Sequence, residues 1–152
     1  MRIETTRFGT REVEADSIIT FPEGLIGLAD VHEYAMIANP AGGPFHWLQA
    51  TGVPDLAFCI INPGIIKQDY RVQVRPEELE SIRLDKVEDG AVVVILVIPR
   101  GAFKEMTANL RGPIVINMRE RLAKQLILTG DEYPVKFQVF REENRTDAPA
   151  SV

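Results

Sequence analysis

The sequence predicts a mainly β protein, a single compact antiparallel barrel or sandwich with one or two short helices. About ten short apolar or alternating segments are separated by glycine, proline, asparagine and aspartate, a pattern typical of strands joined by turns. Only residues 76–82 show a clear helical start, with Pro76 at the first position and acidic residues directly after it. The chain has 152 residues, which is enough for one domain with one core.

Extended segments are expected along the whole chain. The first two form a hairpin around Gly9, and the third stops at Pro22. The strongest strand signal is the apolar run 91–98, which ends at Pro99. The expected strands cover residues 2–8, 11–14, 17–21, 34–38, 45–50, 56–61, 69–74, 91–98, 114–116, 125–128 and 135–140.

Two loop regions need a specific interpretation. Gly24 and Gly27 are spaced like part of a phosphate loop, but the third glycine, the Lys-Ser/Thr end and a long following helix are missing. They are therefore expected to supply positive φ angles in a tight turn. Residues 28–33 are expected to form one helical turn. Residues 118–124 contain good helix formers and, taken alone, fit either a helix or a hairpin connection.

Residues 114–116 are the part of the chain expected to be buried on both faces. Three β-branched residues run there without alternation, between turn residues. Pro113 suits the start of such a strand, because it has no amide hydrogen to lose from the ladder. Asn109 and Asn117 flank the run and leave two interpretations open. Each closes a turn by bonding local backbone, or the two amides present donors and acceptors to a partner.

Composition and charge restrict the class of protein. There are 17 Lys and Arg against 22 Asp and Glu, a net charge of −5, which argues against a primary nucleic-acid binder and fits a basic protein partner.

The single cysteine, Cys59, cannot form an internal disulfide and suggests a reducing compartment. No N-terminal signal segment is recognised, and the longest apolar run is too short to span a bilayer. Residues 141–152 are polar without an apolar period, so a disordered tail is expected.

The sequence shows no pattern of catalytic or metal-ligating residues. His32 and His46 have no cysteine or second histidine near them, so neither a metal nor a cofactor is expected. Cys59 lies in an apolar run, where a thiol is usually an inert buried group. The sequence has no Gly-x-Ser-x-Gly nucleophile motif, and the acidic residues of 76–82 fit a solvated helix face better than an acid–base pair. The interpretation is therefore that the protein is not an enzyme.

An ordered set of motifs resembles the FliW family of flagellar assembly factors. The central motif is Asn109-Leu110-x-x-Pro113-Ile114-Val115-Ile116-Asn117, and the resemblance runs from about Ile3 to Phe140. No single motif is decisive, but their shared order is specific. The other matching stretches are Phe21-Pro22-Glu23-Gly24-Leu25-Ile26-Gly27, Trp47-Leu48-Gln49, Phe58 ahead of Asn62-Pro63, Asp69-Tyr70, Gln125-Leu126-Ile127-Leu128 and Tyr133.

The resemblance implies a fold and a function. It implies a compact β-barrel-like domain over residues 1–140, with a hairpin connection at 118–124. It also implies a cytoplasmic regulatory protein with two exclusive partners. One is flagellin, and the other is CsrA, a small dimeric regulator that represses flagellin translation by binding messenger RNA. Free flagellin would occupy the protein, and export of flagellin would release it to antagonise CsrA. No direct contact with nucleic acid or membrane is expected.

The expected flagellin site combines an apolar groove with a rim of side-chain amides, because flagellin ends are helical and are exposed only before assembly. Trp47 is expected to pack in the core, or to anchor the partner. The residues assigned to this site are Trp47, Gln49, Asn109, Leu110, Pro113, Ile116 and Asn117. The acidic candidates for contact with CsrA, between which the sequence does not choose, are Glu12, Glu14, Asp16, Glu77, Glu78 and Glu80.

Two other functions remain as alternatives at this stage. A small β-barrel can bind single-stranded nucleic acid directly, although that needs exposed aromatic residues and a basic groove, and aromatics are sparse here. A small-molecule enzyme ranks third and would need a deep pocket with convergent titratable groups.

Overall fold

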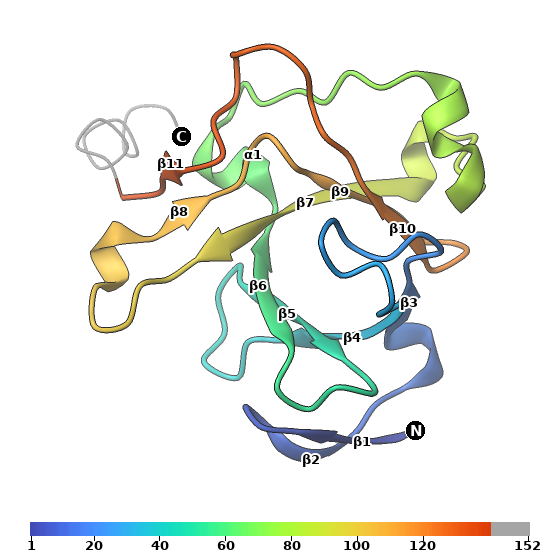
Figure 1. Ribbon diagram of the computed structural model, residues 1–152, viewed down its shortest axis with the longest axis vertical. Helices are drawn as coiled ribbons and strands as arrows, with labels where there is room; N and C mark the ends of the chain where they lie inside the picture. The colour runs from blue at the N-terminus through green and yellow to red at the C-terminus, as the bar shows by residue number, and fades with distance from the viewer. Residues whose placement is uncertain (141–152) are drawn as a thin grey trace.

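The computed structural model describes residues 1–140, so the expected tail at 141–152 lies outside the described residues. A nine-stranded sheet curls into a barrel, because β9 pairs with both β10 and β7 (Figure 1). β8 and β11 lie outside this ring and extend the sheet beyond β7. The seven strands of the ring are β3 (Ile18–Thr20), β4 (Glu33–Ala38), β5 (His46–Ala50), β6 (Ala57–Ile61), β7 (Gly90–Val97), β9 (Ile114–Asn117) and β10 (Leu122–Gln125).

Shorter elements cover the outside of this barrel. β8 (Thr107–Ala108) and β11 (Phe137–Gln138) form its left edge in Figure 1. The hairpin β1 (Arg2–Thr5) and β2 (Gly9–Glu12) lies across its lower end. The helices of the described chain are α1 (Pro63–Ile66) and the 3-10 helices η1 (Ala15–Ser17), η2 (Pro76–Ile82), η3 (Val87–Asp89) and η4 (Phe103–Glu105).

β9 is buried on both faces, as its sequence predicts. Its four residues are all buried, and it pairs antiparallel with β7 and with β10. Ile114 and Ile116 point into the barrel interior, where they pack among the core residues of β3 to β6. Val115 points outward and is covered by Ile82 of η2. The outer face of the barrel therefore has its own core, which explains why the apolar residues of this strand do not alternate with polar ones.

The seam between β3 and β10 is the one parallel pairing in the barrel. Leu122 stands opposite Thr20, and the Thr20 N–H donates to the Arg121 carbonyl at 2.9 Å. Arg121 has a positive φ of 60°, which turns the chain from β9 into β10. The expectation of a mainly β barrel is confirmed, and this single short parallel seam is its exception to antiparallel pairing. The hairpin connection at 118–124 that the resemblance implies is also observed.

Several local predictions are confirmed. η2 spans Pro76–Ile82, the residues predicted to be helical, although its hydrogen bonds are of the 3-10 type. Gly24 and Gly27 have φ angles of 70° and 85°. A Cβ at Gly24 would lie 2.6 Å from the Ala29 Cα, so the loop also requires glycine for its close backbone approach.

Other local predictions are wrong. Residues 28–33 do not form a helical turn, because the Leu28 N–H bonds to the Leu25 carbonyl and these two residues form a β-bridge. Residues 69–74 are not a strand of the sheet, because Asp69 lies in a turn and residues 70–74 pair with no strand of the described chain. α1 was not predicted. Its N-cap, Asn62, accepts a hydrogen bond from the Gly64 N–H at 2.8 Å, and Pro63 follows at the first helical position.

The side chain of Asn117 ties β9 to η2. Its Nδ2 donates to the carbonyls of Ile82 and Arg83 at 2.9 and 3.1 Å, and its Oδ1 accepts from the N–H groups of Arg119 and Glu120. The amide thereby satisfies carbonyls at the C-terminal end of η2 and closes the turn into β10. Asn117 is only 2% exposed, so water cannot replace these partners.

Asn117→Ala is expected to lower the free energy of unfolding by about 3 kcal/mol, because several buried backbone groups lose their partner. Urea denaturation followed by circular dichroism measures the loss. Asn39→Ala is the matched control, since the Asn39 amide makes a single long bond of 3.4 Å to the Gly42 carbonyl. Equal stability of the two variants would show that the Asn117 bonds do not hold η2 on the barrel.

Candidate functional site

The most promising site is an apolar groove on the barrel wall, with a volume of about 370 Å³. It lies where the loop after β3, drawn in blue in the middle of Figure 1, faces β6, β7 and the segment before β9. Three large apolar side chains stand exposed on it: Ile26, Ile127 and Val135, at 54%, 68% and 52%. The groove is lined by Leu25, Ile26, Leu28, Phe58, Ile95, Asn109, Arg111, Gly112, Gln125, Ile127 and Val135.

The groove exists because β8 and β9 pair with the same edge of β7, and the chain leaves that edge between them. Leu96 of β7 pairs with Ala108 of β8, and Val93 pairs with Ile114 of β9, both on the same edge. The residues between them form a turn instead of continuing the ladder. Asn109 closes this turn, since its Oδ1 accepts from the N–H groups of Arg111 and Gly112 at 3.1 and 3.0 Å.

Gln125 bridges the two sides of the groove. Its Oε1 accepts from the Ile26 N–H and its Nε2 donates to the Gly112 carbonyl, each at 3.0 Å. A Cβ at Gly112 would lie 2.9 Å from the Asn109 Nδ2 and 3.0 Å from the Gln125 Nε2, so a larger residue would push these amides out of their present positions. Nearby, Lys124 pairs with Glu23 at 3.5 Å. The groove is therefore apolar along its length with two amides at its rim.

Asn109 is the residue of the predicted flagellin site that lines this groove. Leu110 and Pro113 come from the same segment but are buried beside it. Ile116 and Asn117 are buried residues of β9, a strand of the barrel wall. Of the two interpretations of Asn109 and Asn117, the structure shows the local one for both, because each closes a turn in its own backbone.

Gln49 and Trp47 lie on β5, apart from this groove. Gln49 is fully buried, and its Nε2 lies 3.1–3.3 Å from the carbonyls of Ala50, Val53, Pro54 and Leu56, so it fixes the loop after β5. Trp47 is half-buried under the N-terminal hairpin. The Arg7 guanidinium lies 4.1 Å above its ring, and Phe8 meets it edge-on at 6.0 Å.

Sequence reasoning missed the side chains that shape the groove. Gln125 and Ile127 fall in the expected strand 125–128, of which only Gln125 lies in a strand, β10. Ile26 falls in an expected loop, and Val135 in the expected strand 135–140, which is observed only at Phe137–Gln138. The clue was Gln125-Leu126-Ile127-Leu128, in which apolar residues occupy both faces at the end of a strand. Apolar side chains that gather into one exposed patch, as Ile26, Ile127 and Val135 do, mark a candidate interaction surface.

The titratable groups do not converge on this groove. Burial raises the pKa of the Cys59 thiol to about 11, against the opposing effect of Arg7, so the thiolate form is disfavoured at neutral pH. His32 bonds to the Phe21 carbonyl through Nδ1 at 2.8 Å. Within residues 1–140, no group of three potential metal ligands is found, and no helix is long and apolar enough to cross a membrane.

Comparison with known proteins gives a consistent result. The profile of the family described as FliW protein matches residues 2–139. The chain is 36% identical to the flagellar assembly factor FliW of Natranaerobius thermophilus, over 94% of this chain and 95% of that protein. It is 40% identical to the flagellar assembly factor FliW of Leptospira biflexa, over 88% of each chain. A crystal structure of the flagellar assembly factor FliW matches with a TM-score of 0.86 and 32% identity, over 94% of this chain and 99% of that one.

A closed seven-stranded barrel with an apolar, amide-rimmed groove on its wall defines a small β-barrel scaffold with a surface suited to binding an apolar partner. The matches extend over nearly the whole of both chains and agree in sequence and in fold. The chain belongs to the FliW family of flagellar assembly factors.

Proposed function

We propose that this flagellar assembly factor is a cytoplasmic, non-enzymatic regulator that binds monomeric flagellin and antagonises the translational regulator CsrA. The family membership and the absence of convergent titratable groups on the groove support this proposal. In it, flagellin and CsrA compete for the protein, so that flagellin synthesis follows flagellin export.

The observation that carries the flagellin part is the groove itself. An amphipathic helix binds by laying its apolar face into a hydrophobic groove, and Ile26, Ile127 and Val135 offer such a surface. Asn109 and Gln125 add amides at the rim, although both already bond to local backbone. The proposed contacts are therefore chiefly apolar. Within the wider predicted set, the buried residues Gln49, Leu110, Pro113, Ile116 and Asn117 would act by holding the scaffold, and Trp47 would form a separate contact.

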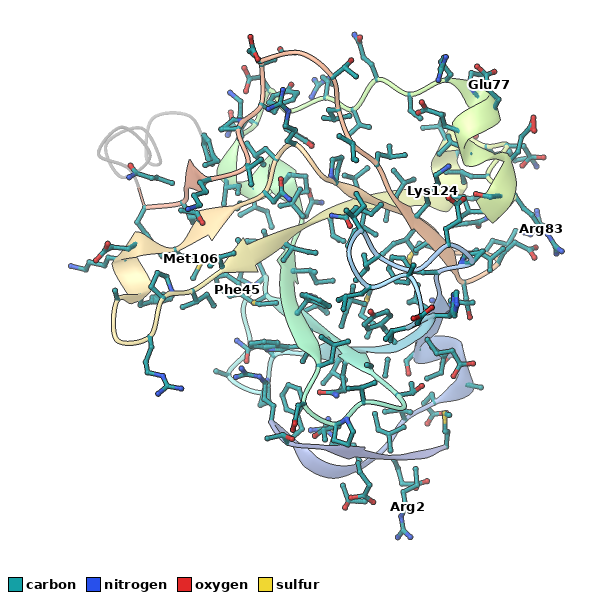
Figure 2. The ribbon with its side chains drawn as sticks, viewed as in Figure 1. Arg2, Phe45, Glu77, Arg83, Met106 and Lys124 are labelled. Carbon is teal, nitrogen blue, oxygen red and sulfur yellow. The ribbon has the colours of Figure 1, made fainter. Side chains whose placement is uncertain are left out.

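The CsrA part rests on charge. A regulator that holds RNA phosphates should carry basic surface, and this protein has a net charge of −5. Two clusters of acidic residues are placed to contact a basic surface of CsrA. One lies on η2 and the other on the N-terminal hairpin. Glu77 projects from the outer face of η2 in Figure 2, where it and Glu78 share Arg75 as a partner. Glu12, at the end of β2, lies 4.0 Å from Arg2.

Replacing the exposed apolar residues of the groove is expected to weaken flagellin binding. Ile26→Ser and Val135→Ser should each reduce the affinity about tenfold, since burying such a side chain is worth about 1.5–3 kcal/mol and 1.4 kcal/mol is a factor of ten. Calorimetric titration with monomeric flagellin measures the change. Val87→Ser is the matched control, because Val87 is 90% exposed on η3, outside the groove.

Unchanged affinity in both groove variants would place flagellin elsewhere on the protein. Trp47→Ala then tests the second surface of the predicted set. A wild-type protein that does not bind flagellin at all would contradict the proposed function.

Association with CsrA is expected to weaken as salt rises, because surface charges are screened beyond a Debye length of about 8 Å at physiological ionic strength. Neutralising the helix group with Glu77→Gln and Glu80→Gln should flatten this salt dependence if CsrA binds at η2. Glu12→Gln and Glu14→Gln are the matched pair on the hairpin. An association insensitive to salt would remove the electrostatic argument, and RNA that fails to displace the protein fully would indicate a non-competitive mechanism.

A further inference from the structure

A second cavity, of about 730 Å³, lies between two extended segments. We call it the slot, and its walls are residues 71–75 and residues 126–129. In Figure 1 these segments are the green trace leading into η2 and the red-orange trace leaving β10, and they run in opposite directions along the top of the barrel.

The first wall has the form of a strand without neighbouring strands. Its exposure alternates: Arg71, Gln73 and Arg75 are exposed, whereas Val72 and Val74 are half-buried against the outer core. The backbone N–H and C=O groups of residues 72–74 make no hydrogen bond to any described residue. Such unpaired backbone is the template to which another strand adds.

The second wall is paired on one edge only. The Leu126 N–H donates to the Pro113 carbonyl at 2.8 Å and the Leu128 N–H donates to the Arg111 carbonyl at 2.9 Å. In an extended chain the backbone groups of the residue between them point to the opposite edge. The N–H and C=O of Ile127 therefore face away from the barrel, and within the described chain they have no partner.

Tyr133, which lines the slot, joins the first wall at one end. The Tyr133 hydroxyl accepts from the Arg71 N–H at 3.0 Å, and the rings of Tyr70 and Tyr133 are in contact, with centroids 4.5 Å apart and planes tilted by 51°. Glu78 of η2 lines the other end. Leu126 and Val74 lie on the lining between the ends, so the slot offers apolar side chains together with unpaired backbone on both sides.

We propose that the slot binds an extended peptide segment of a protein partner as an added β-strand. Backbone hydrogen bonds to Gln73 and Ile127 would supply the affinity. The Arg71 N–H already points to Tyr133 at the end of the slot, and in an extended chain the backbone groups of Gln73 face the same edge as those of Arg71. Because alternate side chains of a strand face opposite sides, the segment should carry apolar residues toward Val74 and Leu126 and polar ones toward solvent. The slot is a different surface from the groove proposed for the flagellin helix, although Ile127 lines both.

The test uses the full chain and a peptide probe that alternates valine and threonine between terminal lysines, acetylated and amidated. Backbone amide resonances are followed by nuclear magnetic resonance as the peptide is added at millimolar concentration. The amides of Gln73 and Ile127 should shift together and exchange more slowly with solvent. A peptide with the same side chains and N-methylated valines should bind at least about tenfold more weakly, because it loses backbone hydrogen bonds.

A variant of the protein provides an independent test of the proposal. Gln73→Pro removes one wall N–H at an exposed position, and the extended Val72 before it tolerates a following proline. The peptide shifts should be lost in this variant and kept in Gln73→Ala. If Gln73→Pro does not fold, the proposal is tested by comparing the binding of the plain and the N-methylated peptide to the unchanged protein.

Three results would overturn the proposal. The first is no shift at these amides with the peptide, and the second is equal binding of the N-methylated peptide. The third is slow exchange at these amides in the free full chain that disappears in a chain ending at Phe140, which would make the chain's own C-terminal residues the occupant.

Discussion

The barrel depends on the pairing of β9 with two strands at once. Without it, β10 and residues 90–93 of β7 would be the open edges of a curled sheet, and exposed edges are templates for aggregation. Ile114 and Ile116 fill the interior on one face of this strand, and Val115 supports η2 on the other. Asn117 completes the arrangement, because its amide holds the end of η2 and the turn into β10 at the same time.

The same constraint creates the surfaces on which function is proposed. Because β8 and β9 share one edge of β7, the residues between them must leave the ladder, and the groove opens at that point. Asn109 and Gln125 stabilise this opening by bonding across it. On the other side, Leu126 and Leu128 continue from β10 with only one paired edge, which leaves the slot beside them. A barrel closed through one buried strand therefore presents two different binding surfaces close together.

The sequence predicted the parts of the fold whose signals are local. Pro76 with its following acids predicted η2, the unbroken β-branched run predicted β9, and Gly24 predicted a turn with positive φ. The parallel seam at Thr20 and the buried bonds of Gln49 could not be predicted, because they join segments that only the closed barrel brings together. For the site, Asn109 was identified, whereas Gln125 was not, since its two hydrogen bonds cross from one loop to another.

The central claim is that closure through β9 is the most stable part of the molecule, and native-state hydrogen exchange tests it most directly. The backbone amides of Ile114, Val115 and Ile116, with their partners on β7 and β10, should exchange only through global unfolding. The amides of the β1–β2 hairpin should exchange through local opening, because that hairpin is a separate two-stranded sheet. Amides of β9 that exchange as fast as those of the hairpin would contradict the account.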